Sequence, residues 1–180
     1  EQIVTVRNVD PFDINDGADP GDGTTDMVLV EVLVRYQGPL DNTPQDMSVS
    51  NDDVDVELIQ IKLSSSSAGT STVTQIVVTG TGTADELTDV VASSVELYRD
   101  TGTVPGSLDA GDFLISGGGS FAGATPTVTF AGLTETVGAG ASVNYLVVCD
   151  LAGLASGGET FSVQLGASTD ISAAPATVSG

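Results

Sequence analysis

Residues 54 to 63 read Val54-Asp-Val-Glu-Leu-Ile-Gln-Ile-Lys-Leu63, and their pattern decides the fold class. Apolar and polar side chains follow one another nearly in turn, as in a strand that buries one face and turns the other to water. The run from Met27 to Tyr36 is apolar at almost every position, which is typical of a central strand. Both stretches are bounded by segments rich in Gly, Pro, Ser and Asp, where the chain can turn.

Similar short segments follow along the rest of the chain. Further strands are expected at residues 2–9, 72–79, 94–99, 113–116, 127–130, 142–150 and 160–165, near Ile171 and at 176–179. Helical periodicity is almost absent, and a single helical turn is predicted over residues 85–90, with Asp85 as its N-cap. The sequence therefore predicts an all-β protein, a β-sandwich (Ig-like or jelly-roll-like) of roughly nine strands with long Asp/Gly-rich loops.

The core has to be built from aliphatic side chains. Hydrophobic residues make up 40% of the 180 residues, but aromatic residues only 4%, and tryptophan is absent. No internal repeat and no long linker divides the sequence, so residues 1–180 are expected to form a single domain. From their position in apolar runs, the predicted core residues are Leu29, Leu33, Ile59, Ile61, Val77, Val147 and Leu165.

The charge balance is strongly one-sided. Four Lys and Arg residues stand against 25 Asp and Glu residues, a net charge of −21. Nucleic acid and anionic lipid surfaces both need basic side chains to neutralise phosphate, so neither is an expected partner. Because the aspartates gather in loops, we expect calcium as the cofactor. The alternative is a purely solubilising acidic surface, as in proteins adapted to high salt, and the composition leaves both open.

Cysteine usage and hydropathy bear on the compartment. Cys149 is the only cysteine, so no internal disulfide can form, and its apolar surroundings predict a buried, inert thiol. No apolar run is long enough to cross a membrane, so direct membrane insertion is not expected. The chain begins at Glu1 and not at a methionine, which favours a processed mature protein, extracellular or at the cell surface.

The first acidic loop places six carboxylates within seventeen residues: Asp10, Asp13, Asp16, Asp19, Asp22 and Asp26. Like charges this close repel one another unless a cation screens them. Calcium accepts several carboxylate and carbonyl oxygens from a flexible loop, and the intervening Gly residues permit sharp turns. The sequence therefore predicts calcium binding here, with a spacing that differs from that of an EF-hand. A solvated acidic loop is the alternative.

The second acidic loop lies between two predicted strands. Asp100 ends one strand, and Asp109 and Asp112 stand three residues apart just before the next, with a Gly-containing segment between. Because both ends of the loop can fold around one cation, Asp100, Asp109 and Asp112 are predicted calcium ligands. The alternative is a hairpin loop in which Asp and Gly serve local hydrogen bonds.

A resemblance to a known kind of module extends over about residues 70 to 170. It is carried by Val95-Glu-Leu-Tyr-Arg-Asp100, Leu108-Asp-Ala-Gly-Asp112, Val128-Thr-Phe-Ala-Gly-Leu133 and Tyr145-Leu-Val-Val-Cys-Asp150. These segments resemble the acidic calcium-loop β-sandwich modules of secreted and surface-layer proteins of bacteria and archaea. In that pattern a strand ending in Leu-Tyr-x-Asp runs into a calcium loop, which implies calcium binding by Asp100, Asp109 and Asp112. The chain departs from it at Thr101, Thr103 and Val104, where further oxygen ligands would stand.

The residues that many enzymes use are missing. With no histidine in the chain, Ser-His-Asp and Cys-His catalysis and His-ligated zinc or iron sites are excluded. No phosphate-binding Gly-Lys-Ser/Thr motif occurs. Paired carboxylates can cleave glycosides, but the chain has no tryptophan and few aromatic residues to form a sugar platform. We therefore expect that the protein is not an enzyme.

These features favour a structural subunit of an extracellular filament, sheath or surface layer, stabilised by calcium and assembled from copies of itself by strand exchange. Residues 1–9 are a candidate intersubunit donor strand, because Ile3, Val4, Val6 and Val9 could complete a neighbour's sheet edge or core. The alternative for this segment is the ordinary first strand of its own domain. The alternative function is a calcium-binding adhesion or binding module of a larger secreted surface protein.

Overall fold

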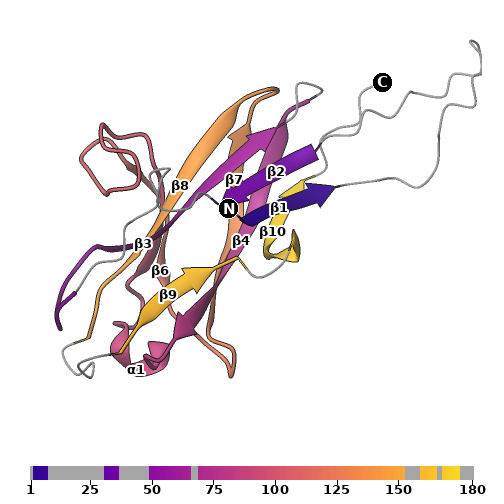
Figure 1. Cartoon of the computed structure of the whole chain (residues 1–180). Coiled ribbons are helices and arrows are strands. Elements are labelled where there is room, and N and C mark those ends of the chain that lie inside the picture. Colours follow the sequence, from indigo (N-terminus) through magenta and orange to yellow (C-terminus); the bar gives the residue numbers. More distant parts are fainter. Residues whose placement is uncertain are drawn as a thin grey trace, which may run out of the picture.

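The computed structural model describes residues 49–65, 69–152, 159–165 and 168–174, together with the backbone of residues 2–7 and 31–36. Within these ranges the chain forms ten strands, one α-helical turn and one 3-10 turn, and every strand pair is antiparallel (Figure 1). The protein is therefore all-β, as the alternating sequence predicts. The predicted calcium loop with Asp10, Asp13, Asp16, Asp19, Asp22 and Asp26, the core candidate Leu29 and the segment 176–179 lie outside the described residues.

The larger sheet has six strands in the order β1-β2-β3-β8-β5-β6. These are β1 (Gln2–Arg7), β2 (Glu31–Tyr36), β3 (Val56–Ser65), β8 (Ser142–Cys149), β5 (Val95–Arg99) and β6 (Phe113–Gly119). The strands β3 and β8 are central, while β1 and β6 form the two edges. In this single chain β1 pairs with β2, from Gln2 opposite Tyr36 to Arg7 opposite Glu31.

The second sheet is organised around the long strand β4 (Ser71–Gly82). One side of β4 pairs with β7 (Thr127–Val137), and the other side pairs with β10 (Ile171–Ala174) and β9 (Phe161–Gln164). The helical turn α1 (Glu86–Asp89) follows β4, and a 3-10 turn (Ser168–Asp170) precedes β10. The carboxylate of Asp85 accepts a hydrogen bond from Leu87 N at 3.1 Å, which confirms the predicted N-cap.

One hydrophobic cluster takes side chains from both sheets, among them Ile59, Ile61, Leu97, Tyr145 and Val147 of the larger sheet and Val73, Ile76, Val78, Val128 and Phe130 of the smaller. An ion pair also joins the sheets. Arg99 of β5 donates from Nε and Nη2 to Oε2 of Glu135 on β7, at 2.9 and 2.5 Å. Cys149 belongs to the same cluster, which confirms the predicted burial of its side chain, and this burial raises the pKa of the thiol to about 12.

Four of the predicted core residues are buried as expected, namely Ile59, Ile61, Val147 and Leu165. The prediction for Val77 is wrong, because its side chain is only partly buried while those of Ile76 and Val78 are fully buried. Leu33 lies in β2, where the structure describes the backbone only.

A β-bulge explains the error at Val77. The register between β4 and β7 shifts between Val73 and Gln75, so Val73 faces Glu135 and Gln75 faces Ala131. In the same place β7 contains Gly132 at φ +71°, the left-handed region that glycine adopts without steric cost. A bulge exchanges the two faces of a strand, so side chains beyond it follow the opposite alternation.

The outer face of the larger sheet is also covered. Gln60, Leu146 and Val148 are buried although they do not belong to the core cluster. The β5–β6 loop, residues 100–112, lies on this face. Its Gly106 N donates to Asp100 at the end of β5, and its Leu108 N donates to Glu57 on β3. Since β8 lies between β5 and β3, the loop crosses over β8 at this point.

Candidate functional site

The β5–β6 loop contains the three predicted calcium ligands that the structure describes. Asp100 follows the last residue of β5, and Asp112 precedes the first residue of β6. Thr101 Oγ1 donates to Gly111 O at 2.7 Å, which ties the two ends of the loop together. The loop is therefore closed at its base, as the sequence predicts.

Asp109 is held by backbone amides of its own loop. One carboxylate oxygen accepts from Gly111 N at 2.8 Å, and the other accepts from Thr103 N at 2.7 Å and Val104 N at 2.9 Å. The Thr103 hydroxyl donates to that second oxygen as well, at 3.0 Å. These donors, led by Gly111 N, lower the pKa of Asp109 because they stabilise the ionised carboxylate.

Asp112 makes a second set of the same kind. Its Oδ1 accepts from Thr101 N and Gly102 N, both at 2.8 Å, and its Oδ2 accepts from Asp109 N at 2.9 Å. The amide of Asp112 in turn donates to Asp109 O at 3.0 Å. The structure thus brings Asp109 and Asp112 together on one small frame of backbone amides.

The glycines of the loop allow this close approach. A Cβ on Gly102 would lie 2.0 Å from Asp109 Oδ1, and a Cβ on Gly111 would lie 2.8 Å from Gly102 Cα. Both distances are far below van der Waals contact, so no larger residue fits without movement of the loop. Such local Asp and Gly bonding is what the hairpin alternative predicts.

Asp100 is oriented differently. Its Oδ2 accepts from Gly106 N at 2.8 Å and from Gln60 Nε2 on β3, so its carboxylate faces the sheet beneath the loop. Among the described residues no three Asp, Glu or Cys side chains are arranged to hold a metal ion. Calcium also accepts backbone and amide oxygens, so calcium binding by this loop stays a prediction.

Sequence reasoning missed the strand residues that hold the loop. Glu57 Oε1 accepts from Ser107 Oγ at 2.9 Å and from Leu108 N at 3.1 Å. Gln60 is fully buried beneath the same loop. Both residues fall on the polar positions of an alternating strand, which normally face water. No local signal marks them, because their partners lie 40 to 51 residues away along the chain.

Comparisons with known proteins assign neither a family nor a function to this chain. In the part of the chain that the structure describes, no helix is long and apolar enough to span a membrane. No protein family, no curated protein and no solved structure matches this chain.

Proposed function

We propose that this chain is a structural subunit of an extracellular filament, sheath or surface layer, stabilised by calcium and assembled by strand exchange. The underlying domain would be a β-sandwich of Ig-like or jelly-roll-like form. Two observations support the sandwich: both sheets contribute to one hydrophobic cluster, and Arg99 of one sheet pairs with Glu135 of the other.

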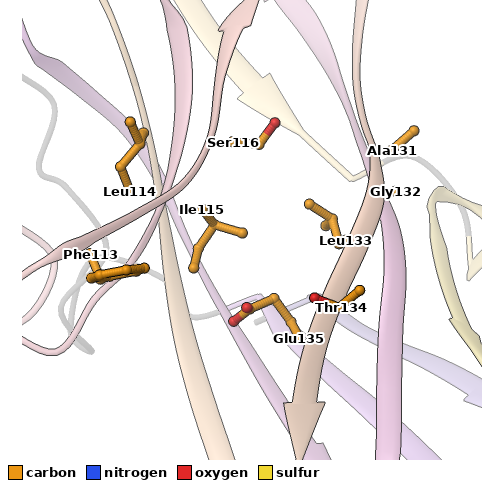
Figure 2. Close-up of a pocket in the computed structure, with 9 residues that line it drawn as sticks. All are labelled: Phe113, Leu114, Ile115, Ser116, Ala131, Gly132, Leu133, Thr134 and Glu135. Carbon is orange, nitrogen blue, oxygen red and sulfur yellow. The ribbon is translucent and has the colours of Figure 1, made fainter.

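A groove between the edge strands of the two sheets is the observation that supports assembly by strand exchange. β6 is the last strand of the larger sheet and β7 the last strand of the smaller one, within the described residues. A groove of about 190 Å³ lies between them (Figure 2). It is lined by Phe113, Leu114, Ile115, Ser116, Ala131, Gly132, Leu133, Thr134 and Glu135. Figure 2 shows Ile115 and Leu133 pointing toward one another across it.

Within the described residues the β6 strand carries neither a charge nor a proline, although β-bulges interrupt its pairing with β5. Phe113 is 66% exposed and Leu114 is 46% exposed, and the strand Phe113–Gly119 contains no charged residue. Edge strands of stable monomers are commonly shielded by charge, proline or a covering segment. An apolar, uncharged edge next to a groove is suited to accept a strand from another chain.

The donor in this proposal is residues 1–9 of a neighbouring copy. β1 lies at the opposite edge of the same sheet from β6, so a contact between the two joins copies head to tail and builds an open filament where the rotation between copies does not close a ring. Leaving β2 and pairing with β6 exchanges one set of backbone hydrogen bonds for another, as in domain swapping. Calcium would screen the repulsion between copies that each carry a net charge of −21.

Deletion of residues 1–9 tests the donor strand. We expect a soluble, folded chain by circular dichroism that forms no fibres in negative-stain images. A synthetic peptide of residues 1–9, added in excess to the full chain, should block elongation, whereas a scrambled peptide should not. Normal fibres from the truncated chain would exclude residues 1–9 as the connector, and a full chain that remains monomeric would support the adhesion-module alternative.

A matched pair of substitutions tests the acceptor edge. Leu114→Lys places a charge on exposed β6 and should stop fibre growth without unfolding the chain. Val104→Lys is the control, because Val104 is similarly exposed, at 54%, but lies in the β5–β6 loop and outside the groove. Equal fibre formation by both variants would show that β6 is not the acceptor.

A further inference from the structure

Three oxygen-bearing side chains meet beneath the β5–β6 loop, on the outer face of the larger sheet. Asp100 N donates to Asn144 O at 3.0 Å, and the preceding pair is Arg99 with Tyr145, so Asp100 and Asn144 stand opposite one another. Gln60 reaches Asp100 from β3, across β8. Residues directly opposite in an antiparallel pair have Cβ atoms about 5 Å apart, so these side chains share one small patch.

Two oxygens in this patch have no hydrogen-bond partner. Gln60 Oε1 and Asn144 Oδ1 are both shielded from solvent and unpaired among the described residues. Gln60 as a whole is 0% exposed. A buried acceptor left unpaired costs about 1–3 kcal/mol, and most buried polar atoms in native proteins are satisfied. Two such acceptors on the neighbouring strands β3 and β8 indicate a partner that attracts oxygen atoms.

The carboxylate of Asp100 adds a charge that no side chain in the described structure balances. Asp100 is 7% exposed, and its hydrogen-bond donors are the neutral amides of Gly106 and Gln60. Lys62 stands opposite Asn144 in register, but it makes no ion pair with Asp100 there. A buried carboxylate without a cation is unfavourable, so the patch favours a positively charged occupant.

We propose that Asp100, Gln60 and Asn144 form a calcium site, with the carboxylate of Asp100 and the two side-chain amide oxygens as ligands. Calcium takes carboxylate and Asn or Gln carbonyl oxygens together, whereas zinc and most transition metals prefer nitrogen or sulfur. Ligation by Gln60 requires a half-turn of its amide, which breaks the hydrogen bond from Nε2 to Asp100 and brings Oε1 to the carboxylate in its place. The site shares only Asp100 with the predicted loop ligands, and it does not depend on filament assembly.

A cation held there would join three strands and their cover. Its ligands come from β3, from β8 and from the start of the β5–β6 loop, next to the loop residue Gly106. Binding would therefore fix the loop against the outer face of the sheet. The site would therefore be one defined position at which calcium stabilises the folded domain.

Calorimetric titration of the chelator-treated full chain with calcium tests the site. Gln60→Met and Asn144→Leu keep the approximate side-chain volume but remove the oxygen, and each should lose one calcium per chain or weaken that site at least tenfold. Asp52→Asn is the control, because it removes a carboxylate at an exposed position outside both the site and the β5–β6 loop, and this site's affinity should stay the same. Fibres are imaged on the same samples, so loss of assembly with unchanged calcium binding would count against the proposed function alone.

Gln60→Glu keeps the proposal testable if the apolar variants fold poorly. A second carboxylate should lower the melting temperature in chelator, through charge repulsion with Asp100, and tighten calcium binding at least tenfold. The proposal is overturned if the wild-type chain takes up no calcium, if Gln60→Met and Asn144→Leu both bind it unchanged, or if calcium does not restore the stability of Gln60→Glu.

Discussion

Asp109 shows how a single carboxylate organises a loop without any basic side chain. Its two oxygens accept hydrogen bonds from Thr103, Val104 and Gly111, which lie on both sides of it in the sequence. The chain has only four Lys and Arg residues. Backbone amides, and not basic side chains, therefore donate the hydrogen bonds that stabilise this carboxylate. The ionised form of Asp109 is therefore the form that the loop requires.

Asp109→Asn should destabilise the chain near neutral pH and much less in acid. The pKa of Asp109 is lowered in the folded state, so its stabilising effect is fully present above the unfolded value of 3.8. It is lost as the pH falls through the lower folded value. An Asn side chain can accept on one side only and presents its NH2 group to the remaining amides. Urea unfolding of both chains from pH 7 to pH 2 measures this, and a constant difference across that range would contradict the proposed role.

At the scale of elements, the β-bulge in the pairing of β4 with β7 decides which side chains of these two strands enter the core. Before it, Val73 is buried; after it, Ile76 and Val78 are buried. On β7 the change falls at Ala131 and Gly132, both exposed, between the buried residues Phe130 and Leu133. The bulge also shapes the groove beside β6, since Ala131 and Gly132 line it.

Gly132→Ala tests the backbone requirement of this bulge. Gly132 has φ +71°, and nothing lies within 4 Å of a Cβ built on it, so the substitution adds strain without a clash. We expect a loss of about 1–2 kcal/mol in the free energy of unfolding. Gly132→Asn is the control, because Asn tolerates the left-handed region better and should lose less. Equal losses in denaturant melts would mean that φ at this position is not the cause.

For the whole molecule, the net charge of −21 opposes both compact folding and contact between copies. Cations can reduce this cost in two ways. General screening depends only on ionic strength, while bound calcium depends on specific oxygen ligands. The two modes correspond to the salt-adapted and the calcium-stabilised alternatives.

Calcium should raise the melting temperature more than sodium chloride at matched ionic strength. A ligand that binds only the folded state adds about 2.7 kcal/mol at a hundredfold excess over its Kd, which corresponds to roughly 5–10 °C for a chain of this size. Thermal melts in millimolar calcium, in chelator and in matched sodium chloride measure the difference. Identical curves in calcium and in sodium chloride would leave only the salt-adapted alternative.

Much of the fold and part of the site could be predicted without coordinates. Alternation predicted β3, an apolar run predicted β8, and Asp85 predicted the cap of α1, because these signals depend on residues close together in the sequence. The closed base of the β5–β6 loop could be predicted for the same reason. Gln60 and Asn144 could not, since a polar residue on a strand gives no indication of what will cover it.

The alternation and composition of the sequence alone established that the chain is all-β, where most of its strands lie, and that its net charge is −21. These properties follow from side-chain periodicity and composition, which are local or additive. Only the tertiary structure decided the strand order, the exchange of faces at the bulge that buried Ile76 in place of Val77, and the burial of Gln60 beneath a loop. Each of these depends on contacts between distant segments, and a one-residue change of register reverses which side chains are buried.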